Sequence, residues 1–359
     1  GAGQETGAAV TRADGAVGVM DPGRSRAAAP SDHHAAETGA GAGAPATGSI
    51  GGPAPTFPTR LVGRREELRT LRRLLLEPGL VTLTGAGGCG KTRLAFRAAE
   101  EASGALRDGA WWVPLAGLAD PALIAQTVAR ALGVPESKQR PAREELLDHV
   151  RERSLLLVLD NCEHLREAAG ELAGALLRAA PRLRILATSR EALGRPGEQT
   201  LRVPSLPVPP PAPGVAEGLE ILDSEAVRLF VDRACRQSPG FAVTPQAAPA
   251  IARIVRRLDG IPLAIELAAA RIGALAPEQI AERLDEGFRL LADRGAAVLP
   301  RQQTLRASID WSYGLLEPEE RKLLARASVF AGGWTLESAE AVCADPAPDA
   351  AEERLGAPA

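Results

Sequence analysis

From Phe57 to Val203, short apolar runs alternate along the chain with longer stretches in which apolar residues recur every three or four positions. The short runs predict buried strands, and the longer stretches predict amphipathic helices. The expected strands are residues 80–84, 110–115, 155–159, 184–188 and 200–203, and the expected helices are 64–76, 93–99, 122–132, 143–151 and 163–179. Because alternating strands and helices form parallel sheets covered on both faces, this segment is predicted to be a three-layer α/β domain.

A proline-rich segment ends this pattern. Residues 204–213 contain six prolines, and proline neither joins a central strand nor continues a helix. Beyond it the apolar spacing is helical throughout. Four expected helices at 224–235, 245–258, 263–272 and 277–284 suggest a small helical bundle. Three more helices are expected at 304–311, 318–329 and 336–343, with a turn at 330–334.

The two ends of the chain have a different composition. Residues 1–56 are dominated by Gly, Ala, Pro, Ser and Thr and contain no aromatic residue, so they cannot bury enough apolar area to offset the entropy of ordering. We expect a disordered tail or linker there, and a second disordered tail at 346–359. Because the chain begins with Gly1 and ends in a short charged stretch, we expect the functional protein to be larger.

The segment between the first strand and its following helix carries the strongest chemical signal. It fits the GxxxxGK[ST] phosphate-binding loop, in which glycines turn backbone N–H groups toward phosphates, the lysine reaches the β- and γ-phosphates and the hydroxyl ligates Mg²⁺. The strand, loop and helix order is the context that this motif requires. The matching residues are Gly85, Ala86, Gly87, Gly88, Cys89, Gly90, Lys91 and Thr92.

The acidic partner of this loop is expected at the end of another apolar strand. Asp160 follows residues 155–159 and is predicted to complete a Mg²⁺ site with Thr92. A strand-ending Asp that caps the next helix is the alternative. Glu163 is the most plausible base for water activation, although an early-helix acid is nearly as good an interpretation. Arg190, after the next strand, is predicted to sense the γ-phosphate, with an ordinary surface arginine as the alternative.

Composition and charge narrow the function classes. The net charge of −3 and the absence of a basic block give no electrostatic footprint for nucleic acid. The four cysteines are isolated, which is typical of a reducing compartment and of neither disulfide frameworks nor zinc sites. No apolar run approaches the roughly 20 residues of a membrane span. We therefore expect a cytoplasmic protein that does not contact membranes.

Taken together, the motifs resemble the STAND class of P-loop ATPases, in particular the NB-ARC-like module of large bacterial transcriptional regulators of the LuxR-type and SARP-like groups. The ordered set is far more specific than any one motif, and it covers most of the chain after residue 56. The segments that carry the resemblance are residues 61–66, 83–95, 156–165, 185–191, 260–264 and 304–313.

The resemblance implies ATP or ADP bound with Mg²⁺ between an α/β domain (57–204) and, after a linker at 205–218, a helical bundle (219–296). It implies that Val62, Gly63 and Arg64 lie near the adenine, and that Arg93 and Pro262 also contact the nucleotide. Residues 297–345 would form a winged-helix unit that packs on the nucleotide domain. The family's histidine-bearing motif at the end of the winged helix is not visible before Ala359.

Three functions compete for this sequence. The first is a regulatory switch that binds ATP or ADP, hydrolyses ATP slowly and self-associates in the ATP state, with DNA contacted only through domains absent from this chain. The second is a P-loop metabolic kinase or another ATP-dependent enzyme. The third is a DNA-binding module that uses the C-terminal winged helix, although the basic residues of 301–329 are nearly balanced by acids, among them Glu317, Glu319 and Glu320. The missing acid directly after Asp160 favours the switch over a fast ATPase.

Overall fold

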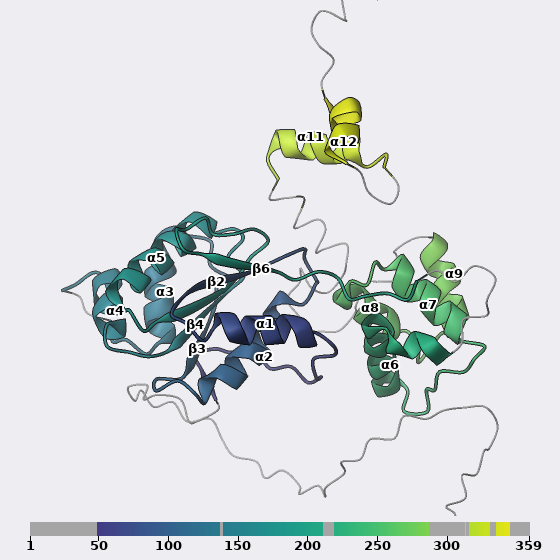
Figure 1. Cartoon of the computed structure of the whole chain (residues 1–359), viewed down its shortest axis with the longest axis horizontal. Coiled ribbons are helices and arrows are strands. Elements are labelled where there is room, and N and C mark those ends of the chain that lie inside the picture. The colour runs from purple at the N-terminus through teal and green to yellow at the C-terminus, as the bar shows by residue number, and fades with distance from the viewer. Residues whose placement is uncertain are drawn as a thin grey trace, which may run out of the picture. The chain divides into compact units, whose positions relative to one another are not determined.

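The computed structural model describes residues 49–136, 139–210, 219–286, 313, 316–330 and 335–344. The chain divides into two units, residues 1–306 and 307–359, which are described separately. The larger unit contains an α/β layer structure followed by a group of helices (Figure 1).

A parallel sheet forms the centre of the larger unit. Its six strands run in the order β1-β3-β4-β5-β2-β6, and every neighbouring pair is parallel. Strand β5 therefore separates β2, which leads into the phosphate-binding loop, from β4, which ends at Asp160. The strands are β1 Ile50–Gly51, β2 Gly79–Thr84, β3 Ala110–Pro114, β4 Leu156–Asp160, β5 Arg184–Thr188 and β6 Gln199–Arg202.

Helices cover both faces of this sheet because successive strand residues point to opposite sides. One core joins Val158 and its same-face neighbours to α1 (Arg65–Leu74) and α2 (Lys91–Ser103). The other core joins Leu157 and its neighbours to three helices. These are α3 Ile124–Ala131, which follows the short 3₁₀ turn η1 Pro121–Leu123, α4 Ala142–Val150 and α5 Arg166–Ala179. The predicted three-layer α/β fold is confirmed.

A third hydrophobic core lies in the helices after residue 218. Phe230, Ile251, Ile265 and Ile280 are fully buried within it. Val62, from the segment before α1, also packs against this core, so the two groups of elements are joined from the start of the α/β segment. The helices are η2 Leu219–Asp223, α6 Glu225–Gln237, α7 Ala248–Arg257, α8 Pro262–Ala269 and α9 Pro277–Glu286.

The smaller unit is described through two helices, α11 Pro318–Ala327 and α12 Leu336–Cys343. The Arg326 guanidinium in α11 donates to the carbonyl oxygen of Cys343 at 2.6 Å, which ties the two helices together. The helix predicted at 304–311 and the tail at 346–359 lie outside the described residues. Among the helices that are described, none combines the length and apolar character that a membrane crossing needs.

Two expectations from the sequence need correction. The tail predicted to be disordered through residue 56 contains β1, where Ile50 and Gly51 pair with Ala110 and Trp111 at the edge of the sheet. The local composition does not favour a strand, but pairing with β3 provides partners for the backbone N–H and C=O groups. The helix predicted from residue 163 begins instead at Arg166. Residues 162–165 form a turn before it, so Glu163 is not an early-helix acid.

Candidate nucleotide-binding site

The phosphate-binding loop takes a shape that only glycine adopts easily. Gly85, Gly88 and Gly90 have φ angles of 146°, 79° and 97°, values that L-residues with side chains rarely adopt. Gly90 precedes α2, and no side chain caps this helix. The first backbone N–H groups of α2 therefore face the loop without a protein acceptor, and the helix dipole adds partial positive charge there.

Lys91 places its ammonium group over this loop. Its Nζ donates hydrogen bonds to the carbonyl oxygens of Gly85 at 2.7 Å and Ala86 at 3.0 Å. Both acceptors belong to the loop itself. The positive charge is thus held beside the backbone N–H groups, and together they form a cradle for an anion.

Asp160 and Thr92 are in contact, although β5 lies between β4 and β2 in the sheet. The Thr92 hydroxyl donates to Oδ1 of Asp160 at 2.9 Å, and the hydroxyl of Thr188, at the end of β5, donates to the same oxygen at 2.7 Å. Burial raises the pKa of Asp160 above its ordinary value, while the hydroxyls of Thr188 and Thr92 lower it in opposition. The alternative role of Asp160, capping the next helix, is wrong, because α5 begins without any side-chain cap.

Thr188 is a site residue that the sequence reasoning did not single out. Its hydroxyl oxygen also accepts a hydrogen bond from the backbone N–H of Asn161 at 2.8 Å. Asn161 has a φ of 69° in the left-handed region, which asparagine adopts more readily than most residues. A signal for Thr188 was present in the sequence, since it ends an apolar strand at the same sheet edge as Asp160.

Buried polar atoms without partners gather at this edge. Asn161 Nδ2, Ser189 Oγ and Arg190 Nε are shielded from solvent and make no hydrogen bond in the described structure. Arg190 Nε lies 3.6 Å from Glu163 Oε1, an ion-pair distance that is too long for a hydrogen bond. Glu163, the predicted base, and Arg190, the predicted sensor, therefore face each other. A bound polar group would satisfy these atoms.

These residues fit a nucleotide with Mg²⁺. The loop N–H groups and Lys91 supply donors for phosphate oxygens, and Asp160 supplies one carboxylate beside the Thr92 hydroxyl. Mg²⁺ typically binds to one or two protein oxygens together with substrate phosphates and waters. No cluster of three or more His, Cys, Asp or Glu side chains suited to a metal exists among the described residues, and a Mg²⁺ shared with phosphates needs none.

The segment before α1 forms hydrogen bonds with the phosphate-binding loop. The buried Arg64 guanidinium donates through Nη2 to the carbonyl oxygens of Cys89 at 3.0 Å and Pro204 at 2.6 Å. Its backbone N–H donates to Glu225 Oε2 in α6 at 3.2 Å. Glycine is favoured at Gly63 because its φ is 71°, and a Cβ there would also force the end of the Glu225 side chain, 2.3 Å away, to shift. This segment joins the loop to the second group of helices, and its proximity to adenine stays a prediction.

The start of α8 touches the loop directly. The backbone N–H of Leu263 donates to the carbonyl oxygen of Gly88 at 3.2 Å. A Cβ on Gly88 would lie 3.0 Å from Leu263 Cβ and 3.5 Å from Ile261 Cγ2. Pro262, predicted to close over the nucleotide, lies between these two residues. It is the first residue of α8, where its fixed φ suits a helix start.

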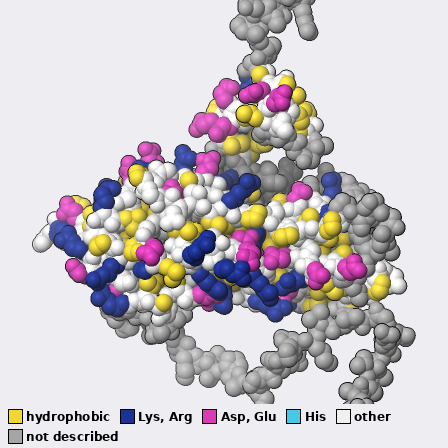
Figure 2. Space-filling view, viewed as in Figure 1, with side chains coloured by type: hydrophobic (Ala, Val, Ile, Leu, Met, Phe, Trp, Pro, Cys, Tyr) yellow, Lys and Arg dark blue, Asp and Glu magenta, His cyan; other side chains and the backbone are white. Residues whose placement is uncertain are grey.

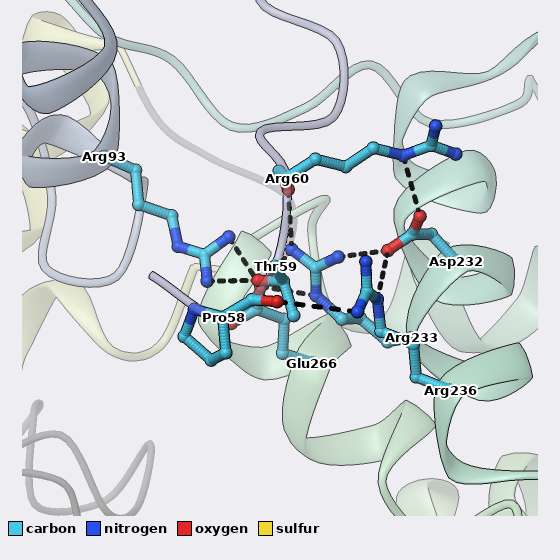
Figure 3. Close-up of polar contacts among 8 residues, drawn as sticks. All are labelled: Pro58, Thr59, Arg60, Arg93, Asp232, Arg233, Arg236 and Glu266. Atoms are coloured by element: carbon cyan, nitrogen blue, oxygen red, sulfur yellow. Dashed lines mark hydrogen bonds and ion pairs between the residues drawn. The ribbon is translucent and has the colours of Figure 1, made fainter. Parts of the chain in front are cut away.

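A network of arginines and carboxylates extends these contacts (Figure 3). Arg93, directly after Thr92, donates to Thr59 Oγ1 at 2.6 Å and pairs with Glu266 of α8 at 3.5 Å. Burial lowers the pKa of Arg93, and Glu266 opposes this effect. Asp232 and Glu266 are the only two acids of the network drawn in Figure 3, where they meet four arginines: Arg60, Arg93, Arg233 and Arg236.

The inner members of this arginine–carboxylate network are shielded from water. Arg233 and Asp232, both in α6, have side chains that are only 8% and 10% exposed. Arg233 also pairs with Glu266 at 2.9 Å. At the surface, basic and acidic side chains gather over the region of α1, α2 and α6 (Figure 2). The network therefore links the helix that starts at Lys91 to both α6 and α8.

Comparison with known proteins shows which family and which fold the chain is similar to. Residues 74–192 match the AAA domain family. The matched range contains the phosphate-binding loop, Asp160 and Arg190. A structure of the Aeropyrum pernix ORC2 protein, determined as ADPNP–ADP complexes, matches with a TM-score of 0.50 at 17% identity and covers 80% of each chain. At this identity the likeness shows a shared P-loop ATPase fold. Such a fold implies nucleotide binding.

Two mycobacterial relatives are more similar in sequence. "Putative HTH-type transcriptional regulator Rv0890c" of Mycobacterium tuberculosis is 47% identical over 274 residues, 76% of this chain and 29% of the relative. "Uncharacterized protein Rv0894" of the same organism is 42% identical over 287 residues, 80% of this chain and 70% of the relative. The chain thus spans about three tenths of the length of the first of these relatives.

Proposed function

The chain belongs to the same family as the uncharacterized Mycobacterium tuberculosis protein Rv0894, and from this relationship and the geometry of its P-loop site we propose that it is an ATP- and ADP-binding switch module of a regulatory ATPase. In this proposal the bound nucleotide sets the arrangement of the helices after residue 218. The name of the longer relative Rv0890c favours a role in transcriptional control.

One observation carries the proposal: the phosphate-binding loop is part of the contact between the two groups of elements. Gly88 accepts a hydrogen bond from Leu263 at the start of α8, and Arg93 reaches Glu266 on the next turn of the same helix. A ligand that binds this loop therefore meets backbone and side chains that also hold α8. Nucleotides with different affinities for two arrangements would shift the population between them.

The chemistry of the site favours slow turnover. Mg²⁺ held by Thr92 and Asp160 would neutralise phosphate charge and orient the γ-phosphate. Glu163, the remaining candidate base, is paired with Arg190, and Asn161 occupies the position directly after Asp160. Hydrolysis would require Arg190 to leave Glu163 for the γ-phosphate, which frees the carboxylate to orient water. We propose that this exchange makes Arg190 the sensor that distinguishes ATP from ADP.

The wider organisation remains part of the proposal. Residues 219–296 would be the helical domain that responds to the nucleotide, and 297–345 a winged-helix unit that packs on the ATPase rather than reading DNA. The ATP-bound state would self-associate in the cytoplasm. DNA would be contacted through domains outside residues 1–359.

Nucleotide content and affinity provide the first test. Purified protein is denatured, and the released nucleotide is identified; affinities for ADP and ATP are then measured by calorimetry with and without Mg²⁺. Lys91→Ala should weaken both nucleotides about 10- to 100-fold, the loss expected for a charge-assisted hydrogen bond. Thr92→Ala and Asp160→Asn should remove the Mg²⁺-dependent part of the affinity. Lys322→Ala, in the smaller unit, is the matched control and should change neither.

The switch itself is tested by shape. Small-angle scattering with ADP and with a non-hydrolysable ATP analogue should give different radii of gyration. Arg190→Gln should make the two profiles converge while ADP affinity is retained, because only the γ-phosphate response is lost. Identical profiles for both nucleotides in the unmodified protein, with both bound, would disprove the switch but leave nucleotide binding intact.

A further inference from the structure

A hollow opens at the edge of the sheet opposite the phosphate-binding loop. Its volume is about 860 Å³, which lies in the ~300–1,000 Å³ range of small-molecule sites. Gly79 and Leu80, at the start of β2, form part of its wall, whereas the loop follows Thr84 at the other end of the strand. The six residues of β2 span about 20 Å, so this hollow is separate from the candidate nucleotide site.

Two glycines of α5 create the hollow. Gly170 and Gly174 lie one turn apart and line the same wall. A Cβ on Gly174 would meet only Arg178 Nη1, at 3.4 Å, whereas a Cβ on Gly170 would lie 2.4 Å from Arg195 Nε. Glycine weakens a helix interior relative to alanine. The hollow is therefore maintained against helix propensity, and two arginines reach into the space that the missing side chains leave.

The lining carries an excess of positive charge. Arg143 from α4, Arg178 from α5 and Arg195 from the segment before β6 face a single acid, Glu171. Within the described structure, Arg143 and Arg178 form neither hydrogen bonds nor ion pairs. Arg195 donates through Nη2 to the Glu167 carbonyl oxygen at 2.9 Å, but its buried Nε has no acceptor. With three guanidinium groups and one carboxylate, the lining of the hollow has a net positive charge.

We propose that this hollow binds a small molecule in which an anionic group, phosphate or carboxylate, is joined to a nonpolar body. The planar guanidinium groups of Arg143 and Arg178 match the oxygens of such anions in bidentate fashion. Leu80 and Leu177 provide the apolar wall for the rest of the ligand. Both free arginines are exposed, so the ligand enters from solvent. This site is independent of the proposed nucleotide switch.

Phenyl phosphate and benzoate serve as probes, with inorganic phosphate as the probe that lacks a nonpolar body. Calorimetric titrations use the full chain saturated with ADP and Mg²⁺, in which the P-loop is occupied, and in parallel the Lys91→Ala variant without nucleotide, in which the P-loop binds phosphates weakly. We expect phenyl phosphate or benzoate to bind with one-to-one stoichiometry in both samples. Inorganic phosphate should bind about 10-fold more weakly than phenyl phosphate, because it buries no apolar surface.

Variants locate the binding. Arg178→Ser should weaken phenyl phosphate about 10-fold or more, whereas Arg182→Ser, four residues along and outside the lining, should leave the affinity unchanged. Gly174→Leu should abolish binding by filling the hollow, and its melting curve should show that the fold is kept. The proposal is overturned if neither organic probe binds in the millimolar range, or if Arg178→Ser and Arg182→Ser bind alike. Weakened nucleotide binding in Lys91→Ala with unchanged probe binding separates the two proposals.

Discussion

Replacing Asp232 by asparagine should destabilise the chain by an amount that the arginine–carboxylate network allows us to work out. The Asp232 carboxylate contacts Arg60, Arg233 and Arg236. Two of these are largely in solvent, with side chains 73% and 49% exposed, so each pair contributes only about 0–1 kcal/mol. The Arg233 side chain is 8% exposed, and its pair with Asp232 dominates.

Breaking a buried ion pair by removing one partner costs about 3–5 kcal/mol, because the other charge stays buried. Arg233 keeps Glu266 at 2.9 Å, which offsets part of this cost. We therefore expect Asp232→Asn to lower the free energy of unfolding by about 2–3 kcal/mol. The loss should persist at high salt, since burial limits ionic screening.

The chain offers a close control in Asp148, which also meets two arginines. Arg140 Nη2 lies 2.8 Å from its carboxylate and Arg151 Nη2 lies 3.1 Å away, but the Asp148 side chain is 46% exposed. Asp148→Asn should cost far less than Asp232→Asn, and its small effect should disappear in salt. Urea unfolding followed by circular dichroism measures both variants. Equal losses for the two would refute the reasoning that burial, and not contact number, determines the stability of this network.

Two further predictions use matched pairs elsewhere in the larger unit. Gly174→Ala should raise the free energy of unfolding by about 0.5–1 kcal/mol, since its Cβ has room and alanine favours the helix. Gly170→Ala should lower the free energy of unfolding, because the Arg195 side chain must move. Melting temperatures of the two variants that shift in the same direction would contradict this prediction. Arg64→Ala should cost about 2–4 kcal/mol, since it leaves two carbonyl acceptors of a buried guanidinium without a donor, whereas Arg69→Ala, an exposed pair on α1, should cost below about 1 kcal/mol. Comparable urea midpoints for the two arginine variants would argue against this role of the Arg64 hydrogen bonds.

Much of the α/β layer could be predicted because its signals are local. The apolar runs gave the strands to within one or two residues, and the strand-loop-helix order gave the phosphate-binding loop. Asp160 was placed beside Thr92 by a simple rule, that carboxyl ends of parallel strands meet at one sheet edge. Thr188 between them could not be assigned a role, because the sequence does not reveal that β5 lies between β2 and β4.

Features that depend on distant contacts were beyond the sequence. Ile50 and Gly51 have no strand pattern of their own, and only the free edge of β3 makes them a strand. Glu163 was read as a helix residue because its neighbours have helical spacing, yet the left-handed Asn161 bends the chain before α5 begins. Arg93 was expected at the nucleotide, and its contacts with Thr59 and Glu266 were not foreseen; Arg233 looks like an ordinary surface arginine in so arginine-rich a chain. Their burial appears only when α2, α6 and α8 are brought together.

The first turn of α2 connects the phosphate-binding loop, β4 and α8. Successive helix residues point about 100° apart, so Lys91, Thr92 and Arg93 face three different partners: the loop carbonyls, Asp160 of β4 and Glu266 of α8. A rigid turn cannot adjust one of these contacts without changing the others. Coupling between binding and conformation is reciprocal. If a nucleotide changes the equilibrium between two positions of α8 by some factor, then moving α8 from one position to the other should change the nucleotide affinity by the same factor.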